Sequence, residues 1–127
     1  MLAGSCLCGN VRFEADEVTR DPAACHCTQC RKQSGHYWAA VQIDDDQLRI
    51  QGEVKWYQSS PSAKRGFCPT CGSFLFWKSE ADADTGVALG AMDAPTGLKL
   101  ERHIFTADQG DYYAIADQVR QEEQEDE

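Results

Sequence analysis

The residues of this chain best suited to chemistry are its seven cysteines, which fall into three tight clusters. The clusters are Cys6 with Cys8, Cys25 with Cys27 and Cys30, and Cys68 with Cys71. A thiolate is the preferred ligand of soft and borderline metal ions, and tetrahedral zinc accepts two short-range thiolate pairs that folding brings together. Two pairs and a triplet therefore predict one closed metal site and one open site.

Disulfide bonds are the main alternative role for these thiols. Residues 1–4 (MLAG) have neither the basic nor the apolar region of a secretory signal peptide, so we expect a cytoplasmic location in which thiols stay reduced. An odd number of cysteines also leaves one thiol over. Cys25 and Cys27 are two positions apart, a spacing that disulfide geometry accommodates poorly. Compartment and spacing together favour metal ligation.

Cys6 and Cys8 are expected to bind the same ion as Cys68 and Cys71. In an extended segment, side chains at positions i and i+2 point to the same face, so Cys6 and Cys8 can both reach one metal. The segment 68–72 (CPTCG) is typical of a metal-binding turn, because its proline stiffens the backbone and its glycine permits a positive φ. The two pairs supply the four thiolates of a structural zinc. The ion would close a loop of about sixty residues, worth about 4 kcal/mol in the chain-entropy model.

The triplet of Cys25, Cys27 and Cys30 has no obvious fourth protein ligand. The first two thiols share a face if the segment is extended, and the following turn can bring Cys30 round as a third ligand. His26 lies between two ligands and would then point away from the metal. Three protein ligands with an open position are the pattern of catalytic zinc. A closed site with an unidentified fourth ligand, or a cluster without metal, is the alternative interpretation.

Length and charge set limits on the rest of the molecule. A chain of 127 residues is long enough for one domain with a core and too short for two, so we expect a single domain over residues 1–118. Residues 119–127 are acidic and nearly devoid of apolar side chains, which predicts a disordered tail. The formal net charge of −9 argues against nucleic acid as a partner. No apolar run approaches the length of a membrane span.

The hydrophobic pattern is short and strand-like. Alternating or branched and aromatic residues predict strands within 11–15, 37–43, 48–50, 54–57, 74–77, 86–89 and 103–105. Loops rich in Gly, Pro and Ser separate several of them. Asp108 to Val119 is the one plausible helix, with Tyr112, Ala116 and Val119 on a usable face. The chain is therefore expected to adopt a mainly β, antiparallel fold with a peripheral C-terminal helix.

Each cysteine cluster lies in a longer motif that resembles a known family. The motifs are Gly4 to Val11 (GSCLCGNV), Cys25 to Arg31 (CHCTQCR) and Arg65 to Gly72 (RGFCPTCG). In order and spacing they resemble the three signature motifs of the glutathione-dependent formaldehyde-activating enzyme and centromere protein V family. The segments 89–93 (LGAMD), 103–105 (HIF) and 111–113 (DYY) are similar to the C-terminal half of that family.

The resemblance implies a zinc-binding β-tent fold with two metal sites. By position, the structural ion would be held by Cys6, Cys8, Cys68 and Cys71, and the catalytic ion by Cys25, Cys27 and Cys30. The family reaction joins glutathione to formaldehyde as S-hydroxymethylglutathione, formally the reverse of a carbon–sulfur lyase step. The implied partners are a small thiol such as glutathione and a small aldehyde.

Basic residues flank both predicted metal sites, although the chain as a whole is acidic. They are Arg31, Lys32, Lys64 and Arg65. These side chains could bind the carboxylates of an anionic thiol such as glutathione. They could equally offset the negative charge of metal–thiolate centres, or be solvated.

Three classes of function fit these residues. The first is a zinc enzyme of carbon–sulfur lyase type, acting on glutathione–aldehyde adducts. The second is a non-catalytic zinc-binding interaction module; the net charge of −9 disfavours its nucleic-acid version. The third is an iron–sulfur or redox protein, which is disfavoured because the thiols lack any recognisable ferredoxin spacing.

Overall fold

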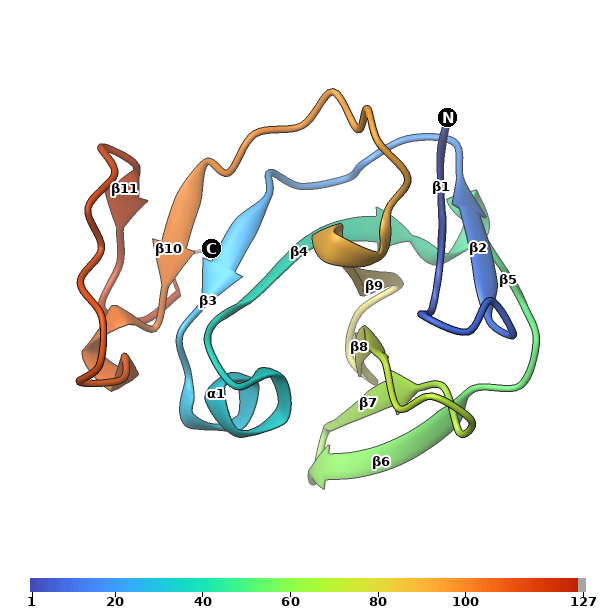
Figure 1. Cartoon of the computed structure of the whole chain (residues 1–127), viewed down its shortest axis with the longest axis horizontal. Coiled ribbons are helices and arrows are strands. Elements are labelled where there is room, and N and C mark those ends of the chain that lie inside the picture. Colours follow the sequence, from blue (N-terminus) through green and yellow to red (C-terminus); the bar gives the residue numbers. More distant parts are fainter. Residues whose placement is uncertain (126–127) are drawn as a thin grey trace.

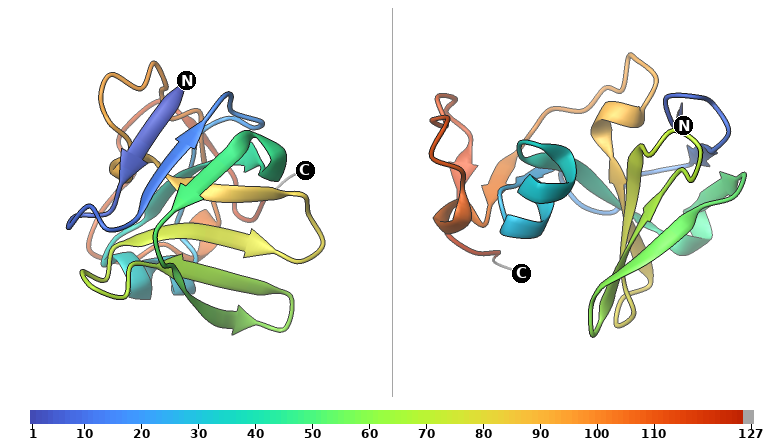
Figure 2. Two further views of the ribbon diagram at one scale, coloured as in Figure 1. Left: turned by 90° about the vertical axis from the view of Figure 1, so that its right-hand side faces the viewer. Right: turned by 60° about the horizontal axis from the view of Figure 1, so that its bottom comes forward.

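The computed structural model of the chain describes residues 1–125. The backbone forms a three-stranded and an eight-stranded sheet (Figures 1 and 2). The smaller sheet has the order β1-β2-β5 and consists of β1 (Leu2–Ser5), β2 (Arg12–Ala15) and β5 (Leu48–Gln51). It lies at the end of the molecule opposite β10 and β11 (Figure 1).

The larger sheet has the order β11-β10-β3-β4-β9-β8-β7-β6. Its strands are β3 (Ala23–Cys25), β4 (Trp38–Asp44), β6 (Lys55–Ser60), β7 (Ala63–Phe67), β8 (Phe74–Ser79), β9 (Asp84–Ala88), β10 (Arg102–Ile104) and β11 (Arg120–Gln121). Helix α1 (Thr28–Ser34) joins β3 to β4. The 3₁₀ turns are η1 (Asp45–Gln47), η2 (Leu89–Ala91) and η3 (Thr106–Asp108).

The hydrophobic core lies between the two sheets. On β2, Phe13 and Ala15 are buried while Arg12 and Glu14 face solvent, as period-two alternation requires. The Phe13 ring packs edge-on against Phe76 of β8 at 5.8 Å between centroids. Cys6 and Cys68 belong to the same cluster of buried residues. The first cysteine site is therefore built into the core.

The predicted mainly β fold is confirmed, with strands at or near all seven predicted segments. Strand pairing is mostly antiparallel, but β10 pairs in parallel with both β3 and β11. Sequence patterns missed β1, β3, β7 and β11, which are short or polar. Within residues 1–125, no helix is long and apolar enough to cross a membrane.

The predicted helix at Asp108 to Val119 is wrong. Turns and irregular backbone occupy residues 109–119, and the α-helix that the described residues contain is α1. Helix propensity is a weak preference that tertiary contacts override. Here the Tyr113 hydroxyl bonds His26, and Asp117 bonds His103. These contacts hold the segment against the residue that follows β3 and against β10 in a non-helical path.

The acidic C-terminal segment also differs from the tail predicted for residues 119–127. Arg120 and Gln121 form β11 beside β10, and Glu122 is buried. The Glu122 N–H donates to the His103 carbonyl at 2.8 Å. A disordered tail therefore does not describe residues 120–125, and residues 126 and 127 lie outside the described part of the chain.

Candidate functional site

Two turns bring the first and last cysteine pairs together. The sulfur atoms of Cys6, Cys8, Cys68 and Cys71 all lie within 4.8 Å of one another. Backbone N–H groups also point at these sulfurs, because Val11 donates to Cys6 Sγ at 3.3 Å and Cys71 donates to Cys68 Sγ at 3.5 Å. Four clustered thiols with backbone donors around them fit a closed tetrahedral zinc site.

Local backbone geometry makes both turns possible. Gly9 and Gly72 have φ values of 84° and 80°, a region that side-chain-bearing residues rarely adopt. Ser73 links the turns, because its hydroxyl accepts the Leu7 N–H at 3.0 Å and lies 3.2 Å from Cys71 Sγ. Sequence reasoning did not identify Ser73, since a serine beside a cysteine turn carries no distinctive spacing.

The cysteine triplet lies where β3 passes into α1. Cys25 ends β3, Cys27 is the N-cap of α1 with extended backbone (φ −64°, ψ 160°), and Cys30 is in the first turn of the helix. The Cys30 N–H donates to Cys27 Sγ at 3.4 Å. The three sulfurs lie within 4.8 Å of one another, and within residues 1–125 no fourth Cys, His, Asp or Glu ligand atom joins the group. Helix α1, and not a simple turn, therefore positions the third thiol, that of Cys30.

The triplet's sulfurs perturb one another strongly. Hydrogen bonds with Cys27 and Cys30 raise the pKa of Cys25. Hydrogen bonds with Cys25 and Cys30 lower the pKa of Cys27. Crowded thiols resist joint ionisation unless a cation shares their charge, and three soft donors without a carboxylate suit zinc. The donor set therefore fits a zinc ion with one open coordination position.

A buried polar network supports the triplet from behind. His26 points away from the sulfurs and is fully buried, with Nδ1 bonded to the Tyr113 hydroxyl and Nε2 2.9 Å from His103 Nδ1. His103 Nε2 in turn lies 3.0 Å from Asp117. The pKa of His26 is lowered to about 4, mainly because the ring is buried and to a lesser extent because His103 and His36 repel a positive charge on it. The Asp117 carboxylate accepts from His103 Nε2, which fixes the orientation of the His103 ring beside His26.

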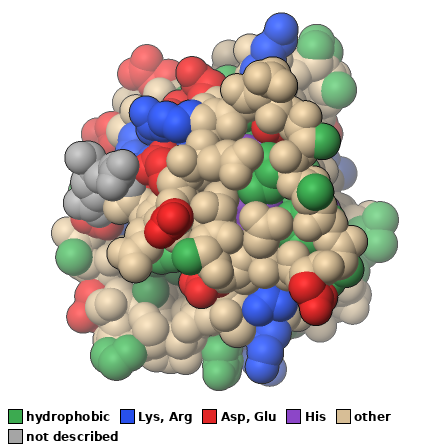
Figure 3. All heavy atoms as spheres, turned by 90° about the vertical axis from the view of Figure 1, so that its left-hand side faces the viewer, with side chains coloured by type: hydrophobic (Ala, Val, Ile, Leu, Met, Phe, Trp, Pro, Cys, Tyr) green, Lys and Arg blue, Asp and Glu red, His purple; other side chains and the backbone are tan. Residues whose placement is uncertain are grey.

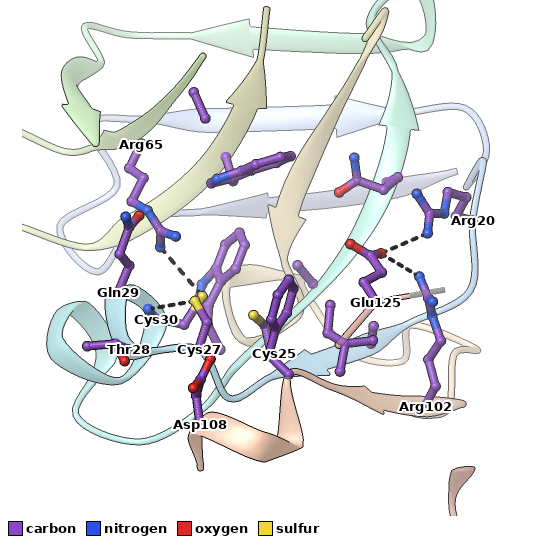
Figure 4. Close-up of a pocket in the computed structure, with 18 of the residues that line it drawn as sticks. Arg20, Cys25, Cys27, Thr28, Gln29, Cys30, Arg65, Arg102, Asp108 and Glu125 are labelled. Atoms are coloured by element: carbon purple, nitrogen blue, oxygen red, sulfur yellow. Dashed lines mark hydrogen bonds and ion pairs between the residues drawn. The ribbon is translucent and has the colours of Figure 1, made fainter. Parts of the chain in front are cut away.

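A cavity of about 460 Å³ opens beside the triplet. Its wall includes all three cysteines, and Trp38, which stacks on Phe74 at 4.2 Å between ring centroids, contributes an apolar side. Figure 4 shows Cys27, Cys30 and Arg65 on one side of this space and Arg20 and Arg102 on the other. A cavity of this size accommodates a small organic ligand.

Arg65 is the flanking basic residue that the fold brings to the triplet. Its side chain is buried, with Nη1 3.5 Å from Cys30 Sγ and 3.3 Å from Gln33 Oε1. Lys64 faces the other side of β7, because side chains alternate along a strand, and its ammonium lies 4.5 Å from the Trp56 ring centroid. A positive charge is thus held directly against the thiols.

The other predicted basic residues are placed differently. Arg31 and Lys32 belong to the last turn of α1 and, like Lys64, are not part of the cavity wall. Their role in substrate binding stays a prediction. The cavity instead contains Arg20 and Arg102, which sequence reasoning missed because nothing in their local pattern marks them as buried or paired.

The fold and the two cysteine clusters define a small mainly β protein with two candidate metal centres. Residues 1–108 match the family model described as glutathione-dependent formaldehyde-activating enzyme, and the chain belongs to this family.

Two relatives illustrate the likeness. A Halomonas elongata protein, provisionally named a glutathione-dependent formaldehyde-activating enzyme, is 34% identical over 86 residues. That match covers 60% of this chain and 55% of the relative, so it spans about half of the relative's length. A crystal structure of a Rhodobacter sphaeroides protein superposes with a TM-score of 0.64 at 26% identity. The superposition covers 75% of this chain and 91% of the Rhodobacter sphaeroides chain.

Proposed function

We propose that this protein is a zinc-dependent enzyme of carbon–sulfur lyase type that forms or breaks the adduct of glutathione with formaldehyde. In this proposal one zinc is structural and one is catalytic. The structural ion is held by Cys6, Cys8, Cys68 and Cys71, and the catalytic ion by Cys25, Cys27 and Cys30. Family membership supports the reaction class.

The observation that carries the proposal is the position of the triplet in the cavity wall. The cluster of four cysteines is tied into the hydrophobic core, and its four thiols are as many ligands as a tetrahedral zinc needs. The triplet supplies three thiols only, and these border a cavity of about 460 Å³. A ligand entering that space can therefore approach the coordination position that the protein leaves open.

A zinc ion at the triplet would supply a Lewis acid that lowers the pKa of a substrate thiol or polarises an aldehyde oxygen. The protein's own residues perform the remaining tasks. Arg65 offsets the negative charge of three thiolates, since its guanidinium contacts Cys30. Trp38, which stacks on Phe74, forms an apolar part of the cavity wall that excludes water from the reacting thiol.

The chemistry itself is balanced without a further reactant. The thiol sulfur attacks the formaldehyde carbon, a carbon–sulfur bond forms, and the carbonyl π bond breaks. The thiol proton ends on the former carbonyl oxygen to give the hydroxymethyl group. The reverse step returns that proton to sulfur as the carbon–sulfur bond breaks.

The decisive experiment measures exchange between glutathione, formaldehyde and their adduct by NMR, with and without protein. Formaldehyde and glutathione combine unaided, so the enzyme must accelerate exchange above that background. The acceleration should disappear in Cys27→Ser while the thermal melt stays close to that of the wild type. Exchange at the background rate with fully zinc-loaded protein would overturn the proposal and leave a non-catalytic zinc module.

A further inference from the structure

Two arginines at one side of the cavity converge on a single carboxylate. Glu125 Oε2 lies 2.8 Å from Arg20 Nη2 and 2.9 Å from Arg102 Nη2. Figure 4 shows both guanidinium groups pointing at this carboxylate, on the side of the cavity away from Arg65. All three residues contribute to the cavity wall. Paired guanidinium groups that meet one carboxylate are a recurring way to recognise anionic ligands.

Arg102 is held in place independently of Glu125. Its side chain is only 4% exposed, and it also lies 3.4 Å from Asp21 and 3.5 Å from Glu122. Glu122 is shared with a further arginine, because Arg120 Nη2 lies 3.0 Å from Glu122 Oε2. Glu125 is therefore the carboxylate that Arg20 and Arg102 have in common, and one carboxylate from a ligand, placed where Glu125 lies, would meet the same two guanidinium groups. Figure 3 views the β11 side of the molecule, where acidic and basic side chains lie next to one another.

The Glu125 side chain can leave without unfolding its segment. The backbone around it is held by the Thr106 N–H, which donates to the Glu122 carbonyl at 3.0 Å, and by the Phe105 N–H, which donates to the Gln124 carbonyl at 3.4 Å. The Glu125 side chain is 28% exposed, so rotation about its own bonds moves the carboxylate into solvent. The segment also lies beyond the residues 1–108 that match the family.

We propose that Arg20 and Arg102 form a carboxylate-binding subsite of the cavity, and that Glu125 occupies it as an intramolecular competitor. The ligand is a small thiol that carries at least one carboxylate. The thiol in this proposal rests on the proposed function, in which the triplet is the partner of the substrate thiol. The C-terminal segment thereby sets the affinity of this chain for its own substrate.

The test compares binding of glutathione and S-methylglutathione by calorimetry. Glu125→Gln removes the competing charge and should bind glutathione about tenfold more tightly, because the empty subsite becomes the dominant state. Glu123→Gln is the matched control, since it makes the same charge change in the same segment at an exposed side chain. Arg20→Gln should weaken binding, and its thermal melt reports whether it is folded.

The outcomes separate this proposal from the proposed function. S-methylglutathione keeps both carboxylates but has no ionisable thiol. If Glu125→Gln binds both ligands more tightly than the wild type does, the subsite is upheld. If the two ligands also bind equally well, that result counts against a contact between the glutathione thiol and the metal. Equal affinities in Glu125→Gln and Glu123→Gln overturn the subsite, even if Cys27-dependent exchange persists. Absence of glutathione binding to every variant also overturns it.

Discussion

Replacing Cys68 with serine should destabilise the whole domain far more than replacing Cys27. Cys68 is fully buried in the core, and its thiol joins the turn after β7 to the turn after β1. Loss of the closed site reopens a loop of about sixty residues, which costs about 4 kcal/mol. A buried hydroxyl left without its ligand contacts adds about 1–3 kcal/mol. The sum is comparable with the 5–15 kcal/mol that stabilises a typical domain.

Thermal unfolding followed by circular dichroism, in buffer containing zinc, measures this difference. At this chain length, a loss of 5 kcal/mol corresponds to a Tm lower by at least about 15 °C, and Cys68→Ser is expected to be partly unfolded already at room temperature. Cys27→Ser should lower the Tm by less than about 5 °C, because the triplet lies at a cavity wall outside the core. Equal melting temperatures for the two variants would refute the division into a structural and an open site.

Two further outcomes follow from particular side chains. Arg65→Gln removes the charge beside Cys30 and should weaken zinc binding at the triplet about 10- to 100-fold in chelator competition, whereas Lys64→Gln, the same charge change on the other face of β7, should not. A second outcome concerns the Asp45 carboxylate. Burial raises the pKa of Asp45, but hydrogen bonds from Lys78 and Thr85 lower it by more, so the net pKa is below its ordinary value. The carboxylate therefore stabilises the fold above about pH 4, and this contribution is lost as pH falls through the depressed pKa. The urea midpoint of the wild type should exceed that of Asp45→Asn at pH 6, and the gap should close in more acidic buffer; a constant gap would contradict the ion pair's role.

The clustering of the cysteines within each motif was predictable because it depends on short-range spacing. Cys6 and Cys8, like Cys25 and Cys27, are two residues apart, and extended backbone turns such neighbours to one side. The grouping of all seven sulfurs into a set of four and a set of three agrees with the sequence prediction. The orientation of His26 away from the triplet agrees with it too, for the same reason.

The far side of the cavity could not be predicted, because its residues meet only through the folded chain. Glu125 lies 105 positions from Arg20 and 23 from Arg102, and acidic residues at the end of a chain ordinarily predict a solvated tail. The helix prediction for 108–119 was wrong for a similar reason, because distant residues determine the path of this segment. Its apolar spacing fits a helix, but Tyr113 contacts His26, just after β3, and Asp117 contacts His103 on β10, and local sequence cannot reveal these partners.

The most direct test of the central claim is the zinc content per chain of protein purified without added metal. We predict two zinc ions in the wild type and one in Cys27→Ser, with the β-rich circular dichroism spectrum unchanged. One zinc in the wild type, or the same content in both proteins, would contradict a second site at Cys25, Cys27 and Cys30.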